Sequence, residues 1–192
     1  MQLNFPTLAL AAGLASNVQA AAIVSPRNDS NPTLMYSRAV EAGSLQYWGS
    51  ASEQPVMFDW EAAWTNPASW PPVPLSDAPT VNQQCGNDDV FCSEVNLAPT
   101  DLCEKMIDIL IRNRGVDIPS GVNGLSLTSG RWVCYMAWRS SVDNMRQGYL
   151  INAAEATLRK CGANGAVSGW AETVNLNNAC TSQCLSNRFD CR

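Results

Sequence analysis

The chain has 192 residues, a formal net charge of −5 and no histidine. Its 12 lysines and arginines form no basic run, so neither a nucleic acid nor an anionic membrane surface is an expected partner. The absence of histidine excludes Ser-His-Asp triads, Cys-His pairs and every histidine-ligated metal.

The first 20 residues predict a cleaved signal peptide. The apolar stretch from Phe5 to Ala15 is too short to span a bilayer, and Val18-Gln19-Ala20 has the small-x-small pattern that signal peptidase cuts. The alternative interpretation is a buried helix. No later stretch reaches the roughly 18 consecutive apolar residues of a membrane helix. We therefore expect a secreted protein with no membrane span, in which the sequon at Asn28 is a candidate N-glycosylation site.

Residues 21–82 form a predicted tryptophan- and proline-rich N-terminal extension without cysteine. Trp60 and Trp64 stand four residues apart, so a short helix from Asp59 would place them on one face. The run WPPVP that begins at Trp70 must be extended. Trp60, Trp64 and Trp70 are candidate partner-binding residues that could grip a sugar polymer or a partner groove. The alternative, that they pack against the cysteine-rich domain, is favoured because large exposed aromatics invite aggregation.

Residues 83–192 form a predicted cysteine-rich domain. An even number of cysteines in an exported chain predicts four disulfides. No paired C-x2-C spacing of a zinc or thioredoxin-type site is present, so we expect no metal and no cofactor. The eight predicted disulfide cysteines are Cys85, Cys92, Cys103, Cys134, Cys161, Cys180, Cys184 and Cys191.

The first half of this domain predicts a helix and a strand. A helix opens at residues 98–101 with a capping Thr or Asp, carries apolar residues at helical spacing, and ends before Gly115. Residues 117–130 are rich in Gly, Ser and Asn and predict a loop. The run from Arg131 to Trp138 alternates bulky residues and predicts a central strand, with Trp132 on the same face as Cys134.

The second half predicts another helix and two strands. Apolar residues recur at helical spacing from Tyr149 to Cys161, and strands are expected over residues 166–176 and 179–185, with an edge strand before Cys92. This order favours an α+β fold in which two helices cover one face of an antiparallel sheet, stapled by disulfides as an αβ sandwich. On a strand Cys180 and Cys184 lie about 13 Å apart and cannot bridge one another. We expect them to reach a helix cysteine, Cys103 or Cys161, and the segment of Cys85 and Cys92.

Paired carboxylates are the remaining catalytic option, because a glycan hydrolase needs two acids facing across a cleft. Asp88-Asp89, Asp59 with Glu61, and Asp143 are the candidates, whereas Asp101 and Glu104 fit the positive end of a helix. Nothing around any pair singles it out, so solvated surface acids and no catalytic residues are the expectation.

Four stretches of the chain resemble the fungal secreted WD-like domain proteins, a similarity that covers about residues 95–192. The stretches are PTDLC from Pro99, VC-x3-W from Val133, Lys160-Cys161, and ACTSQCLSNR-x2-C from Ala179. The resemblance implies a secreted, cysteine-rich fungal protein and no β-propeller. The predicted architecture is also similar to the killer-toxin-like αβ sandwich and to necrosis-inducing fungal effectors. Killer toxins of that shape act through basic surface residues, whereas this chain has only two lysines, Lys105 and Lys160.

From these observations we expect a secreted, non-enzymatic interaction protein of a fungus, with a host-directed effector as its more specific form. Its expected partner is an unknown protein or a cell-wall glycan. The alternatives are a carboxylate-only glycan hydrolase that uses Trp60, Trp64 and Trp70 as sugar platforms, and a structural protein that binds cell-wall polysaccharide.

Overall fold

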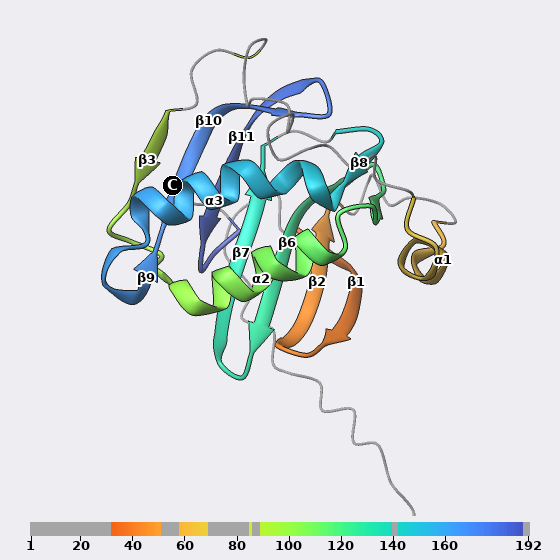
Figure 1. Cartoon of the computed structure of the whole chain (residues 1–192), viewed down its shortest axis with the longest axis horizontal. Coiled ribbons are helices and arrows are strands. Elements are labelled where there is room, and N and C mark those ends of the chain that lie inside the picture. The colour runs from red at the N-terminus through yellow and green to blue at the C-terminus, as the bar shows by residue number, and fades with distance from the viewer. Residues whose placement is uncertain (1–31, 51–57, 69–84, 86–88, 140–141, 190–192) are drawn as a thin grey trace, which may run out of the picture.

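The computed structural model describes residues 32–50, 58–68, 85, 89–139 and 142–189. The predicted signal peptide, Asn28, Trp70, Asp88 and Cys191 lie outside these residues. The described part contains an antiparallel sheet of seven strands (Figure 1). In spatial order the strands are β1 (Thr33–Val40), β2 (Gly43–Gly49), β6 (Val122–Ser129), β7 (Trp132–Trp138), β11 (Ala179–Ser186), β10 (Gly169–Leu176) and β3 (Val90–Cys92).

Two short strand pairs and three α-helices complete the described elements. Strand β4 (Ala98–Pro99) pairs with β9 (Ala166–Val167), and β5 (Asp117–Ile118) pairs with β8 (Met145–Arg146). The helices are α1 (Trp60–Thr65), α2 (Thr100–Arg112) and α3 (Ile151–Cys161), with 3-10 turns η2 (Gln147–Leu150) and η3 (Ala163–Gly165) on either side of α3. Within the described residues, no helix is both long and apolar enough to cross a membrane.

Helices α2 and α3 lie side by side across the same side of the sheet in Figure 1. Both helices present an apolar stripe: Met106 and Leu110 of α2, and Ala153 and Ala154 of α3, are buried. The small alanines let α3 approach the sheet closely. The mostly antiparallel sheet with a few helices agrees with the α+β class expected from the sequence.

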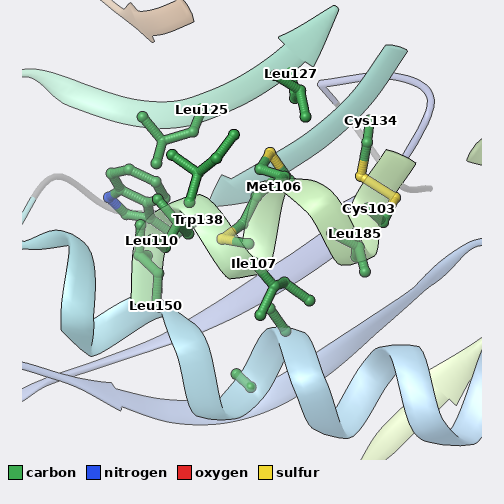
Figure 2. Packing of buried hydrophobic residues seen from close by; sticks show 14 of the residues in the cluster. Cys103, Met106, Ile107, Leu110, Leu125, Leu127, Cys134, Trp138, Leu150 and Leu185 are labelled. Carbon is green, nitrogen blue, oxygen red and sulfur yellow. A yellow bond between two sulfur atoms is a disulfide. The ribbon is translucent and has the colours of Figure 1, made fainter. Parts of the chain in front are cut away.

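The core lies between α2 and strands β6, β7 and β11. Figure 2 shows Met106, Ile107 and Leu110 of α2 facing the strand residues Leu125, Leu127 and Leu185. Each fully buried side chain of this size stabilises the fold by roughly 1.5 to 3 kcal/mol relative to an exposed one.

Several predicted elements are confirmed, with small shifts at their ends. Helices α2 and α3, strands β7 and β11, and the edge strand β3 fall where the sequence predicts them. The predicted strand over residues 166–176 is divided into β9 and β10. The predicted cap of α2 is wrong: the N-cap residue is Pro99, which makes no side-chain cap hydrogen bond, and the Thr100 hydroxyl instead donates to the Gly162 carbonyl at 3.5 Å.

The loop predicted over residues 117–130 is wrong, because most of it forms β6 in the middle of the sheet. Its alternate residues Leu125 and Leu127 are buried in the core, and its polar and small residues have partners on the other face of the sheet. The Ser126 hydroxyl accepts a hydrogen bond from Trp48 Nε1 at 2.9 Å and donates one to Gln46 Oε1 at 3.2 Å. Ser and Gly at these positions therefore belong to a strand.

The stretch predicted as an N-terminal extension contributes two strands of the same sheet. Strand β2 pairs with β6 along its length, and β1 forms the edge next to β2. Leu45 and Tyr47 of β2 are fully buried in the shared core. The described residues 33–49 are thus continuous with the sheet of the cysteine-rich region.

Three disulfides join elements that are distant along the chain: Cys85–Cys180, Cys92–Cys161 and Cys103–Cys134. The prediction that one of the two strand cysteines bonds the segment of Cys85 and Cys92 is confirmed, since Cys180 bonds Cys85. The predicted bond from Cys180 or Cys184 to a helix cysteine is wrong, because Cys103 bonds Cys134 of β7 and Cys161 bonds Cys92 of β3. Cys184 is also disulfide-bonded.

Candidate functional site

Trp60 and Trp64 use their rings to hold α1 against strands β1 and β2. The helix begins as predicted, with the Asp59 carboxylate accepting from the Ala62 amide. The Trp60 ring stacks on Tyr36 with centroids 4.6 Å apart, and the Arg38 guanidinium lies 4.8 Å from the Trp64 ring centroid. Both tryptophans are half-buried against the core, so they contribute to packing.

Glu61 strengthens this contact between α1 and β1. Its carboxylate accepts from the Tyr36 hydroxyl at 2.8 Å and from Arg38 Nη1 at 3.3 Å. The Glu61 side chain is 71 % exposed, so its ion pair with Arg38 adds little free energy.

Tyr47 lies beneath this cluster and connects β2 to η2. Its hydroxyl accepts a hydrogen bond from Gln147 Nε2 at 2.6 Å, and the side chain is fully buried. Burial raises the pKa of Tyr47 far above its ordinary value. The hydroxyl therefore stays neutral and serves as a structural acceptor.

The candidate catalytic carboxylates in the described residues make different structural contacts. Asp59 caps α1, Glu61 pairs with Arg38, and Asp143 accepts a hydrogen bond from the Ser120 hydroxyl at 2.7 Å. Asp101 pairs with Lys105 at 3.5 Å within α2. Asp89 is exposed just before β3. The structure does not bring these candidates together as one acid pair.

An open groove lies at the N-terminal end of α2, where β4, β9 and the β6–β7 turn meet. Its volume is about 480 Å³, which is within the range of ligand sites. Its apolar lining residues include Leu97, Pro99 and Trp132, and its polar ones are Asp101, Lys105 and Ser129. We call this feature the Trp132 groove.

Trp132 is exposed because it is the first residue of β7. Further along the same face of the strand, Cys134 and Met136 are fully buried, but Trp132 lies at the groove beside the first turns of α2 and is 53 % exposed. The Arg131 guanidinium lies 4.7 Å from its ring centroid and occupies part of the ring surface. The rest of the indole lines the groove.

Exposed large hydrophobic side chains in the described residues occur near this end of the fold. Leu97 and Trp132 line the groove, and Val95 precedes Leu97 by two residues. Phe91 is also exposed but stacks on Trp170, outside the groove lining. Leu97 and Trp132 therefore leave apolar side-chain area exposed at the groove.

Sequence reasoning missed this groove because the alternation of β7 assigned Trp132 to the core face. The available signal was its position, since a tryptophan directly after the turn residues Gly130 and Arg131 lies at the end of a hairpin.

A model of the fungal WD-like family matches residues 73–192, which is more than half of the chain. The chain belongs to this family. The match reaches further toward the N-terminus than the resemblance noted in the sequence. No curated protein and no solved structure matches this fungal WD-like chain.

The matched residues of this fungal WD-like protein include the whole lining of the Trp132 groove. Strands β1 and β2 and helix α1 precede the matched region. The cluster of Trp60 and Trp64 is therefore separate in sequence from the family region, although β2 extends its sheet.

Proposed function

We propose that this fungal WD-like protein is a secreted, non-enzymatic interaction protein that binds its partner in the Trp132 groove. The observation that carries the proposal is the half-exposed indole of Trp132 beside Leu97 and Pro99 in an open groove. Exposure of such a ring costs free energy in water, and a partner that covers it recovers that free energy.

Export is part of the proposal. The signal-peptide pattern of residues 1–20 supports it, and so do the disulfides of the described residues, because such bonds form and persist in oxidising compartments. The partner is an extracellular protein or a cell-wall glycan. A host-directed effector is the more specific form of this function, supported by the disulfide density.

A binding role without turnover is supported by the acids of the groove. Asp101 is the one carboxylate among its lining residues, and it pairs with Lys105. Hydrolysis of a glycosidic bond requires two carboxyl groups on opposite sides of the bond. The groove supplies a binding surface with a single acid.

Retention of the purified, unreduced protein tests the proposal. Wild type, Trp132→Ala, Leu97→Ser and the control Phe91→Ala are incubated with insoluble fungal and plant cell walls and with immobilised extracellular proteins from the same sources. Phe91 is a matched control because it is an exposed aromatic outside the groove lining. Release of reducing sugar is followed in parallel.

We expect wild type and Phe91→Ala to be retained on at least one material, and both groove variants to be lost from it, without sugar release. Equal retention of wild type and Trp132→Ala on every material would overturn the proposed site. Steady release of sugar by wild type would overturn the non-enzymatic role.

A further inference from the structure

The charge of the Trp132 groove favours an uncharged ligand. Among the lining residues, Asp101 and Lys105 contribute one charge of each sign at 3.5 Å and cancel, and the neighbouring Arg131 on the Trp132 ring adds one positive charge. The whole chain is acidic, with a net charge of −5, and would repel a polyanion at low salt. Electrostatic complementarity therefore favours a neutral partner.

The groove combines an aromatic wall with polar groups that remain hydrated. The side chains of Asp101 and Lys105 are 71 % and 56 % exposed, so each keeps hydrogen-bonding capacity toward a ligand. The exposed Ser129 adds a hydroxyl at the end of β6. Sugar rings require this combination, because their C–H faces are apolar and their edges carry hydroxyls.

We propose that the Trp132 groove binds a neutral polysaccharide, with one sugar ring stacked on the indole of Trp132 and its hydroxyls bonded to Asp101, Lys105 and Ser129. This inference rests on the proposed function and names its ligand class. Arg131 lies 4.7 Å from the Trp132 ring centroid, so a sugar stacks on the ring surface that Arg131 leaves uncovered.

The groove does not enclose its ligand. Its lining comes from segments around residues 97–105, 129–132 and 165–166 and is open to solvent, so a long ligand can extend beyond the lining residues. The arrangement gives binding without cleavage, because only Asp101 supplies a carboxylate.

The experiment is an NMR titration of the full, oxidised protein that follows the tryptophan indole N–H signals. The Trp132 signal is assigned as the one missing from Trp132→Phe. The probes are neutral hexasaccharides of β-1,3-glucan, β-1,4-glucan and chitin, with an oligogalacturonide as anionic control and a proline-rich peptide as protein-type control. The variants are Trp132→Phe, Trp132→Ala and the exposed-aromatic control Phe91→Ala.

We expect at least one neutral hexasaccharide to shift the Trp132 signal and the anionic one to leave it unchanged. Because the Trp132 variants lack this signal, their binding is measured by isothermal titration calorimetry with the same hexasaccharide. Trp132→Ala should weaken binding about tenfold or more, whereas Trp132→Phe and Phe91→Ala should change it less than Trp132→Ala. Trp132 is half-exposed, so the variants should fold, which the unchanged remaining indole signals would verify.

Failure of this inference differs from failure of the proposed function. If no neutral hexasaccharide shifts the Trp132 signal while Trp132→Ala still loses retention on immobilised proteins, the polysaccharide is wrong and the groove remains a protein-binding site. A shift of this signal by the peptide alone gives the same conclusion. If neither saccharide nor protein binding depends on Trp132, both proposals fall.

Discussion

At the scale of single residues, the ring of Phe189 leaves no room for a side chain at Gly124. A Cβ on this residue of β6 would collide with the aromatic ring of Phe189, which packs edge-on over Tyr135 with centroids 6.4 Å apart. Gly124→Ala should therefore lower the free energy of unfolding by roughly 1 to 3 kcal/mol. Urea unfolding measures the change.

A double-mutant cycle separates this collision from the loss of backbone freedom. In a Phe189→Ala background the ring is gone, so Gly124→Ala should then cost little or become stabilising, because alanine restricts the unfolded chain. An equal cost in both backgrounds would contradict the role of Phe189.

Tyr47 gives the molecule a dependence on alkaline pH. Burial raises its pKa in the folded state, with the charge of Tyr36 as a further cause, while the unfolded state titrates near the ordinary value of about 10. The unfolded state therefore loses its proton first. Stability should be constant below about pH 10 and fall above it.

The variant Tyr47→Phe tests this sign. It should lower stability at neutral pH by about 1 to 3 kcal/mol, because Gln147 loses its acceptor in the core, and it should flatten the alkaline decline. Unfolding curves between pH 7 and 11 show both effects. An unchanged alkaline slope would assign the decline to another group, such as Tyr36 or Tyr135, whose pKa values burial also raises.

At the scale of elements, α1 is held by aromatic packing more than by charge. Trp60→Ala removes the stacking on Tyr36 and the contact with Tyr47, and should cost about 2 to 4 kcal/mol. Glu61→Gln should cost under about 1 kcal/mol, because its ion pair is exposed. Hydrogen exchange of residues 60–66, with urea unfolding, tests both. Loss of ligand binding in Trp60→Ala without loss of stability would instead favour a ligand platform.

Elements with a local pattern could be predicted from the sequence. The apolar stripes of α2 and α3 and the alternation of β7 each specify a buried face within a short window. The α+β class followed from their order along the chain.

Strand β6 and the groove could not be predicted in this way. Gly124 and Ser126 resemble turn residues until their partners Phe189 and Trp48 are known, and those lie far away in the sequence. The exposure of Trp132 depends on where α2 begins relative to the start of β7. The alternation of residues within β7 does not tell where α2 begins.

At the scale of the whole molecule, the cluster of Trp60 and Trp64 and the Trp132 groove lie at different parts of the sheet. Helix α1 lies beside β1 at one edge, whereas β9 and the first turn of α2 lie toward the other edge in Figure 1. The tryptophans of α1 thus complete the core at one edge, and Trp132 is left exposed beside the first turn of α2. A ligand can bind there without disturbing the packing of α1.

The disulfides should contribute unequally, because loop length and burial act in opposite directions. Cys85 and Cys180 are separated by 95 residues and Cys103 and Cys134 by 31, so chain entropy alone favours the first bond by about 1 kcal/mol. Cys103 and Cys134 are fully buried, however, and their replacement by alanine removes two core sulfurs at a cost of about 2 kcal/mol or more. Burial should decide the order.

Accordingly, Cys103→Ala/Cys134→Ala should unfold at lower urea concentration than Cys85→Ala/Cys180→Ala. Both double variants leave no unpaired thiol from the deleted bond, so disulfide exchange does not confuse the comparison. If the exposed bond of Cys180 proves the more stabilising, restriction of the unfolded chain outweighs core packing, and the disulfides maintain the fold chiefly by connecting distant segments.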